Sequence, residues 1–565
     1  MQDREFDFVV VGSGSAGSVL ACRLSEDPAN SVLVLEFGGR DNSIFIKMPS
    51  ACTIPMNSKR FDWRFMTEPE PGLNGRRIHQ ARGKVIGGTS SINGMCYLRG
   101  HAGDFDLWER LGAEGWSYSH CLPYFRRAEQ CSYGGDQYRG DCGPQYIGNG
   151  NNMRNPLYRA FIDAGTQAGY LHSADVNGYQ QEGFGRMDMT VKGGVRWSTA
   201  DAYLKPAMKR PNLTVEMHAL TRRVLMEGKR AVGVEYAKGG EVFRVKARRQ
   251  VILSAGPFNS PKLLMLSGIG NGEHLREHGI ETVHHLPGVG ENLHDHLGIW
   301  FQQACTQPIT LNSQMNPLSK LLIALRWILF KDGLGATNHF ESNGYIRSRP
   351  GIPFPDIQYH FVAGAMVFGG ANKLKGHGFQ ANLSPGKPRS RGRVRLRSGD
   401  PADPPTMVFN YLDREDDRLT FRLGIRLTRE IFAQSAFDPY RGREIAPGAG
   451  VHSDDEIDAW VADYGSTAYH PCGSCKMGSD DAAVVDPQTR VHGVEGLRVV
   501  DSSIMPFITN GNLNAPTIMI AEKAADMILG RDPLQPSNAP AYYADGWETT
   551  QRPGAPERDL EITLN

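Results

Sequence analysis

The sequence predicts a mixed α/β fold (α+β overall) whose parallel sheet is assembled from distant segments, and three observations support this prediction. A strand-like run of residues 7–11 leads into a glycine-rich turn, and a second apolar run, one helix length later, ends at Glu36. Two further apolar runs of the same kind lie at residues 251–256 and 497–501. Between them, alternating residues such as Arg393-Val-Arg-Leu-Arg397 favour a half-exposed antiparallel sheet.

These runs divide the chain of 565 residues into two lobes and a tail, because a chain of this length exceeds one small core. The lobe with the parallel sheet is expected to be Rossmann-like and to comprise residues 1–155, 215–305 and 461–530. A second lobe, with an antiparallel sheet and helices, is inserted as residues 156–214 and 306–460. Residues 531–565 are rich in proline and polar residues, which predicts an extended C-terminal tail.

The first turn reads Gly12-Ser13-Gly14-Ser15-Ala16-Gly17, which is a Gly-x-Gly-x-x-Gly pattern between a strand and a helix. Gly12 allows the tight turn, Gly14 lets the backbone approach a pyrophosphate, and Gly17 lets the helix pack closely on the sheet. The pyrophosphate would lie at the helix N-terminus, where unpaired N–H groups favour negative charge. Glu36 ends the second strand, where a carboxylate can accept hydrogen bonds from a ribose. The pattern predicts a dinucleotide, either FAD or NAD.

The composition is that of an ordinary enzyme and excludes some partners. The net charge of +1 argues against a nucleic-acid partner, which would favour a basic excess. The nine cysteines form no regular framework, which favours reduced thiols and a cytoplasmic location. Cys472-Gly-Ser-Cys475 has no second such pair and His294-x-His296 has no third ligand nearby, so no metal site is predicted.

Residues 318–330 form an apolar, helix-like segment that carries or adjoins Lys320, Arg326 and Lys331. The segment is too short to span a bilayer, and most segments of this kind are buried helices. The alternative is a helix in residues 318–331 that lies at the inner face of the cell membrane, because apolar bulk with basic flanks suits a lipid interface. No signal peptide is predicted, because acidic residues occur among the first seven positions and the first apolar run belongs to a strand.

Two longer segments relate the glycine-rich turn to a known protein family. Residues 83–96 read GKVIGGTSSINGMC, and residues 256–270 read GPFNSPKLLMLSGIG. Together with the first turn, they resemble both signature segments of the glucose–methanol–choline (GMC) oxidoreductases, and the likeness extends over nearly all of residues 5–530. It is closest to the bacterial choline dehydrogenase branch, through Thr67-Glu-Pro-Glu-Pro and His470-Pro-Cys-Gly-Ser-Cys among others. The resemblance implies FAD and the oxidation of an alcohol.

The resemblance also implies how FAD is held. Some relatives tether FAD covalently through a histidine where this chain has Ile92, and no histidine occurs between Ala81 and Gly100, so non-covalent FAD is expected. Asp501 would face the ribityl or pyrophosphate region, and Asn93 and Gly94 would approach the isoalloxazine. The predicted cofactor contacts are Gly12, Ser13, Gly14, Ser15, Ala16, Gly17, Glu36, Arg82, Gly83, Gly88, Thr89, Asn93, Gly94, Met95, Val224, Ala255, Asp501 and Asn512.

Oxidation of an alcohol needs a base for the hydroxyl proton and a donor for the developing alkoxide, while the flavin takes a hydride. A histidine, whose ordinary pKa is about 6.5, can serve as a neutral base at working pH. Tyr469-His470-Pro471 and the segment 509–516 resemble the catalytic segments of the family, which implies His470 as base and Asn512 as its partner. His360 aligns with a substrate-contacting histidine of choline-oxidising relatives, and its alternative is a strand histidine with local partners.

The sequence differs from choline-oxidising relatives at the residues expected to contact the substrate. Choline carries a permanent positive charge, and its pocket needs an aromatic face and usually a carboxylate. In choline-oxidising relatives a glutamate follows the Asp-His pair by two positions, where this chain has Gly298. Phe340 stands where a cage tryptophan is found, and Trp63 and Glu341 remain as substitutes. The predicted substrate residues are His360, Tyr469, Phe340, Gly298 and Trp63.

We therefore expect FAD-dependent oxidation of a primary alcohol to its aldehyde, with an uncharged alcohol favoured over choline because of Gly298. The electrons would pass to a quinone or another carrier. Three alternatives stay open: a choline dehydrogenase that makes betaine aldehyde, an oxygen-using alcohol oxidase, and a non-redox hydroxynitrile lyase on the same scaffold. The sequence does not fix the oligomeric state.

Overall fold

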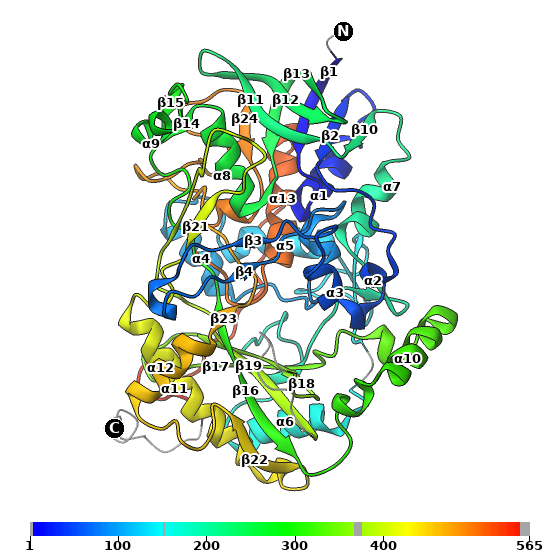
Figure 1. Cartoon of the computed structure of the whole chain (residues 1–565), viewed down its shortest axis with the longest axis vertical. Helices are drawn as coiled ribbons and strands as arrows, with labels where there is room; N and C mark the ends of the chain where they lie inside the picture. The colour runs from blue at the N-terminus through cyan, green and yellow to red at the C-terminus, as the bar shows by residue number, and fades with distance from the viewer. Residues whose placement is uncertain (1–3, 151–152, 367–375, 554–565) are drawn as a thin grey trace.

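The computed structural model describes residues 4–150, 153–366 and 376–553, and it shows two lobes, each built around a sheet (Figure 1). The first sheet has the strand order β10-β2-β1-β13-β12-β11, and β24 pairs with β13. Strands β10, β2, β1, β13 and β24 run parallel, whereas β13, β12 and β11 form an antiparallel ribbon. The strands are β1 (Arg4–Val11), β2 (Val32–Glu36), β10 (Leu213–Met217), β11 (Leu220–Glu227), β12 (Arg230–Lys238), β13 (Glu241–Leu253) and β24 (Leu497–Val499).

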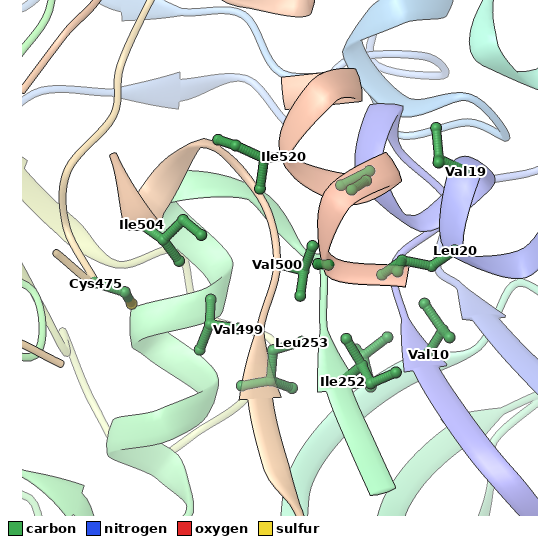
Figure 2. Packing of buried hydrophobic residues seen from close by; sticks show 14 of the residues in the cluster. Val10, Val19, Leu20, Ile252, Leu253, Cys475, Val499, Val500, Ile504 and Ile520 are labelled. Carbon is green, nitrogen blue, oxygen red and sulfur yellow. The ribbon is translucent and has the colours of Figure 1, made fainter. Parts of the chain in front are cut away.

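The predicted return of the run 251–256 to the first sheet is found in the structure, because Val251 pairs in parallel register with Val9. Helices pack on the sheet, and Figure 2 shows Val10, Ile252 and Val499 of three neighbouring strands among side chains such as Leu20 and Ile520. Strands buried on both faces are expected to be apolar throughout, as these runs are. The helices of this lobe include α1 (Ser15–Leu24), α4 (Ala102–Arg110), α5 (Tyr118–Ala128), α8 (Gly256–Leu266) and α13 (Asn514–Leu529).

The second sheet is antiparallel and has the order β22-β16-β19-β18-β17-β7, with β23 paired to β16. Its strands are β7 (Gly183–Arg186), β16 (Leu297–Cys305), β17 (Ser342–Ile346), β18 (Ile357–Val362), β19 (Gly378–Pro385), β22 (Arg441–Ala446) and β23 (Ser466–Thr467). Its aromatic core includes Phe161, Phe361 and Phe432, contributed by a strand and by covering helices. The helices of this lobe include α6 (Pro156–Gln167), α10 (Pro317–Phe330), α11 (Glu415–Phe432) and α12 (Asp454–Tyr464).

Three expectations about segments differ from the strand pairing. Residues 461–530 were expected in the first lobe, but β23 pairs with β16 of the second sheet. The predicted boundary placed residues 297–305 in the first lobe, but β16 pairs with β19 from Ile299 to Ala304 and belongs to the second sheet. The alternation of buried Ile299 and Phe301 with less buried neighbours fits one face of that antiparallel sheet. The alternating residues 393–397 form only the short strand β20 (Arg393–Arg395), which pairs with β21 (Thr406–Val408) outside both large sheets.

Short elements complete the described chain, and residues 531–553 of the tail contact both lobes. Ser537 donates its N–H to Ser119 in the first lobe, whereas Arg552 pairs with Glu430 in the second. The remaining paired strands are β3 (Phe65–Met66) with β4 (His79–Gln80), β5 (Glu129–Cys131) with β6 (Gln145–Ile147), β8 (Val191–Lys192) with β9 (Val195–Arg196), and β14 (Ile269–Gly270) with β15 (His284–His285). The remaining short helices are α2 (Ile44–Lys47), α3 (Thr53–Met56), α7 (Lys205–Ala207) and α9 (Gly272–Glu277).

Candidate active site

A cavity of about 1910 Å³ is lined by residues of both lobes and collects most of the predicted site residues. Its wall includes the turn after β1, the end of β2, the segment 81–96, and residues of β16 and β18. The predicted residues on the wall are Gly12, Gly14, Ser15, Ala16, Glu36, Trp63, Arg82, Gly83, Gly88, Thr89, Asn93, Gly94, Met95, Ala255, Gly298, Phe340, His360, Tyr469, His470, Asp501 and Asn512.

The first glycine turn is fixed by close packing. Gly12 has a φ of +98°, and a Cβ there would lie 2.5 Å from the carbonyl oxygen of Ser254. A Cβ on Gly17 would lie 1.9 Å from the carbonyl oxygen of Gly12, so the helix packs directly against the turn. Gly14 is different, because its Cβ would meet only the Cα of Gly88, at 3.9 Å. Gly14 therefore leaves space on the cavity side, as the approach of a pyrophosphate requires.

Two predicted cofactor contacts of this turn, Ser13 and Gly17, do not reach the cavity. Ser13 donates both its backbone N–H (3.0 Å) and its hydroxyl (2.8 Å) to Oε2 of Glu36, while Oε1 accepts the N–H of Gly38 (2.7 Å). Ser13 and Gly17 do not line the cavity, but they hold the turn and Glu36 in place. Burial raises the pKa of Glu36, and the hydrogen bonds to its carboxylate oppose that rise.

The second glycine-rich segment meets the first backbone to backbone. Gly88 has a φ of +52°, and a Cβ there would lie 2.6 Å from the Cα of Gly14. Thr89 accepts the N–H of Gly83 at 3.1 Å, and Asn93 accepts a hydrogen bond from the guanidinium of Arg196 at 2.8 Å. Backbone without side chains thus forms a wall at which a large anionic ligand can come close to N–H groups.

Three helices begin at this wall, since residues of their first turns line the cavity. Ser15 opens α1, Gly256 opens α8 and Asn514 opens α13, and the amide of Asn514 donates to the hydroxyl of Ser15 at 2.8 Å. Asp501 accepts the N–H of Gly256 (2.9 Å), and burial raises its pKa. The backbone cradle and the converging helix N-termini fit the pyrophosphate of FAD.

The other end of the cavity carries a chain of histidines and amides. Nε2 of His470 lies 2.9 Å from Nδ2 of Asn512, and Nδ1 of His470 lies 3.0 Å from Nδ1 of His296. Oδ1 of Asn512 lies 3.0 Å from Nε2 of His360. The N–H of His470 donates to the buried carboxylate of Asp295 at 2.7 Å. The structure therefore brings the predicted pair together with His360.

One backbone carbonyl determines which atom donates in each hydrogen bond of this series. Nε2 of His296 lies 3.2 Å from the carbonyl oxygen of Gly386, which can only accept, so that nitrogen carries the proton. Nδ1 of neutral His296 then accepts from Nδ1–H of His470, which leaves the lone pair of His470 on Nε2. Nδ2 of Asn512 donates to that lone pair, and the Asn512 carbonyl accepts from His360. The assigned tautomer makes Nε2 of His470 a base on the cavity wall.

Burial keeps these rings neutral. It lowers the pKa of His470 well below the ordinary value of 6.5, and electrostatic interactions with His296, His360 and Arg82 also oppose its protonation. Burial likewise lowers the pKa of His296 and of His360 to about 4. Asp295, which accepts the N–H of His470, has its pKa raised by burial, and hydrogen bonds from Thr467 and Tyr411 oppose this rise. A neutral imidazole can accept a proton from a substrate hydroxyl.

Next to these hydrogen-bonded residues, aromatic and amide side chains line the cavity. Gly298 and Trp300 line the cavity from β16, and alternate residues of a strand share a face. The ring centroid of Phe340 lies 6.5 Å from that of Trp300 and 5.8 Å from that of His360. A Cβ on Gly298 would lie 3.0 Å from the side chain of Asn382, whose amide donates to the carbonyl of Ile299. Asn382 therefore occupies the space next to Gly298.

Some predicted contacts lie elsewhere. Val224 is buried in the first core, gives its N–H to Ser267 and does not line the cavity, because it points into the sheet–helix packing instead. Trp63 lines the cavity but stacks between Phe37, which follows Glu36, and Phe65, on the nucleotide side. Glu341 is not on the wall, and its carboxylate accepts from Thr337 and from the N–H of Met153.

Four residues of the site were missed from the sequence: His296, Asp295, Trp300 and Asn382. The sequence suggests no catalytic role for His296, and His296 does not pair with His294 at a metal, because the ring nitrogens of His294 contact the Asn292 carbonyl and the Ile508 N–H. Trp300 could have been found, since it follows Gly298 at the spacing of one strand face.

Comparison with known proteins matches this architecture to a family. The N-terminal pattern of the GMC oxidoreductases matches residues 6–298, and their C-terminal pattern matches residues 388–521. The chain belongs to the GMC oxidoreductase family. It is 57% identical over 558 residues to the oxygen-dependent choline dehydrogenase of Photobacterium profundum, covering 98% of both chains. It is 54% identical to the enzyme of that name from Brucella canis, covering 97% of this chain and 100% of the relative.

Solved structures share the fold. A pyridoxine 4-oxidase from Mesorbium loti has a TM-score of 0.85 and 32% identity, covering 93% of this chain and 100% of its own. A formate oxidase of Aspergillus oryzae RIB40, in which FAD modification was studied, has a TM-score of 0.88 and 27% identity, covering 94% and 99%. The predicted family, the α/β fold, the FAD cofactor and an alcohol-type oxidoreductase resembling choline dehydrogenases are confirmed.

Proposed function

We propose that this GMC oxidoreductase converts an uncharged primary alcohol to its aldehyde, with His470 as the base. The observation that carries the proposal is the hydrogen-bond chain from Gly386 through His296, which leaves the lone pair of His470 on Nε2 beside Asn512. A substrate hydroxyl that displaces the hydrogen bond between Nδ2 of Asn512 and Nε2 of His470 would give its proton to Nε2. The amide of Asn512 would then donate to the developing alkoxide.

The lobe with the parallel sheet is proposed to hold FAD non-covalently, and the lobe with the antiparallel sheet to hold the alcohol. Gly14, Gly88 and the first turn of α1 would face the pyrophosphate, Glu36 the ribose, and Asp501 the ribityl or pyrophosphate region. When bound, FAD supplies the acceptor for the substrate hydride. Ile92 supports the absence of a tether, because its side chain is buried in an apolar cluster and cannot form the covalent bond of a histidine.

The cavity wall supports a neutral substrate over choline. The carboxylates on the described wall are Glu36, Asp463 and Asp501, and none of them is hydrogen-bonded to His470, Asn512 or His360. Gly298 adds no charge, and Asn382 fills the adjoining space with an amide. A cation would lose its water there without a carboxylate partner, at a cost of a few kcal/mol, and only the rings of Trp300 and Phe340 would oppose this loss. Choline is the second candidate, because the relatives from Photobacterium and Brucella carry that name.

The enzyme is proposed to pass its electrons to a quinone or another carrier. It is also proposed to be cytoplasmic, with residues 318–331 in contact with the inner face of the membrane. No helix in the described parts of the chain is long and apolar enough to span a bilayer. Direct use of oxygen is the alternative to a carrier, since the named relatives are oxygen-dependent.

Anaerobic mixing of the holoenzyme with a substrate panel tests the proposal. We expect neutral primary alcohols to bleach the flavin, and 3,3-dimethylbutan-1-ol to do so with a higher kcat/KM than choline, its charged counterpart of equal shape. No bleaching by any alcohol, together with cleavage of cyanohydrins, would contradict the oxidation. A preference for choline would contradict the neutral substrate, and the rate of reoxidation in air separates oxygen from a carrier.

A further inference from the structure

Helix α10 turns an aliphatic face to solvent. Its outer residues recur at helical spacing and are 45–71% exposed, namely Leu318, Leu321, Leu322, Leu325, Ile328 and Leu329. On the inner side Trp327 is buried and donates its Nε1–H to the carbonyl of Gly194 at 2.7 Å. A surface helix of a globular lobe normally buries its apolar stripe and exposes its polar one. Figure 1 shows α10 projecting from the body of the molecule.

A second apolar segment joins α10 at the same surface. Trp327 packs in one cluster with Met48 and Ala51, which lie between α2 and α3. Ile44, Phe45 and Ile54 of this segment are 37–48% exposed. We call residues 44–56 and 317–330 together the apolar rim. An exposed apolar surface on this scale marks a contact with a partner or a membrane.

The apolar rim borders the cavity that holds His470. Phe45 and Ile54 line that cavity from one side of the rim, and Ile323 and Ala324 line it from α10. The inner side of α10 is therefore part of the cavity wall, while its outer side faces solvent. A surface that covers the rim would lie at the mouth of the active-site cavity.

The charge of the two rim segments favours an anionic lipid surface. The apolar rim contains Lys47, Lys320 and Arg326 and no acidic residue. Lys59, Arg60 and Lys331 follow its two segments, with Asp62 and Asp332 next to them. Lys47 and Arg326 already have carboxylate partners in Asp201 and Asp332. Basic side chains beside an apolar helix are attracted by anionic headgroups within about a Debye length of the surface.

The dimensions favour a helix that lies in the interface. The 14 residues of α10 measure about 21 Å at about 1.5 Å per residue, which is shorter than the roughly 30 Å of a bilayer core. A lipid surface can deform around a single projecting helix, whereas a second copy of the chain would need a groove of matching shape. The outward leucines would insert among the acyl chains and leave the basic residues at the headgroups.

We infer that the apolar rim docks on an anionic bilayer and opens the active-site cavity toward the lipid, so that the substrates are primary alcohols that partition into membranes. This inference rests on the proposed alcohol oxidation and adds the substrate class and the lipid surface. An aliphatic alcohol would reach His470 along the apolar inner side of α10 without crossing bulk water. Alcohols with long chains are concentrated in the bilayer at the mouth of the cavity.

Flotation of the holoenzyme with vesicles tests the docking. Wild-type protein should float with vesicles of phosphatidylcholine and phosphatidylglycerol, and less with phosphatidylcholine alone. The variant Leu321→Ser/Leu325→Ser/Leu329→Ser should float about tenfold less, because three inserted side chains are lost. The matched control Leu111→Ser/Met208→Ser/Val242→Ser, at positions 39–43% exposed away from the rim, should float like wild type. Wild-type protein that does not float, or a triple rim variant that floats equally, would overturn the inference. So would a wild-type dimer that the rim substitutions convert to a monomer.

Kinetics separate this inference from the proposed function. With 1-dodecanol supplied in the same vesicles, the rim variant should show a kcat/KM about tenfold below wild type, whereas with 1-butanol in water both should be equal. Equal values for 1-dodecanol would overturn the substrate class while alcohol oxidation stands. Absence of flavin reduction by 1-butanol in wild-type protein that floats would instead contradict the oxidation.

Discussion

At the scale of single residues, the catalytic proposal depends on which nitrogen of His470 carries a proton. The carbonyl of Gly386 accepts from His296, and that one contact orders the chain as far as His360. The sequence segments predicted His470 and Asn512 through their resemblance to a family. They could not predict His296 in this role, because 174 positions separate the two rings in the chain.

We predict that His296→Leu slows flavin reduction by about tenfold, because His470 loses the acceptor that fixes its tautomer. The substitution also removes a neighbour that lowers the pKa of His470, so the acid limb of the rate should move to higher pH. Anaerobic stopped-flow kinetics across pH measure both effects. His296→Gln, which keeps an acceptor, should recover part of the rate. A slower enzyme with an unmoved pH limb would indicate a merely structural role.

The wild-type rate should be insensitive to pH through the ordinary range of histidine titration. Because burial lowers the pKa of His470 well below 6.5, the neutral base persists as pH falls, and its loss begins only below that value. The limiting rate of flavin reduction should stay level from about pH 8 to about pH 6.5 and decline at lower pH. A decline centred at or above pH 6.5 would contradict the pKa direction.

Gly298 and Asn382 should act together on specificity. A side chain at position 298 begins 3.0 Å from the Asn382 amide, so Gly298→Glu alone is crowded. The double variant Gly298→Glu/Asn382→Ala provides both charge and room, and its kcat/KM for choline relative to 3,3-dimethylbutan-1-ol should rise by at least about tenfold. Asn382→Ala alone is the control and should leave that ratio near the wild-type value. An unchanged ratio in the double variant would show that position 298 does not set the charge preference.

At the scale of elements, the glycines of the first turn have distinct duties. The pattern predicted the close packing found at Gly12 and Gly17, because only glycine allows contacts this short, whereas the approach of Gly14 to a pyrophosphate stays a prediction. It did not predict that Ser13 turns from the cavity to Glu36, since a serine at that position can face either way. The membership of β16 in the second sheet was also missed, because strand partners distant in sequence leave no local signal.

Gly17→Ala and Gly14→Ala should therefore fail in different ways. Alanine at position 17 places a Cβ 1.9 Å from the Gly12 carbonyl and should lower the melting temperature of the apoprotein. Alanine at position 14 meets protein only at 3.9 Å and should leave that temperature unchanged, while weakening FAD binding by about tenfold or more. Thermal unfolding and FAD titration measure the two effects. Equal loss of fold stability in both variants would contradict the assignment of Gly14 to the cofactor.

At the scale of the whole molecule, the site exists only where both lobes meet. The glycine turns and Asp501 come from the first lobe, whereas Gly298, Phe340 and His360 come from the second. The alternation of residue patterns predicted two lobes and two kinds of sheet. The sequence did not predict the exposure of α10, because an apolar helix has the same residue pattern whether its apolar side chains are buried in a core or exposed.

In the proposed mechanism, the two lobes together deliver an alcohol to a neutral base beside the flavin. The most direct measurement is anaerobic flavin reduction by a neutral primary alcohol in wild-type holoenzyme and in His470→Ala, with His172→Ala, an exposed histidine, as control. We predict reduction in the wild type and the control, and reduction slower by about 10²-fold or more in His470→Ala with FAD still bound. Reduction of His470→Ala at the wild-type rate would contradict the account.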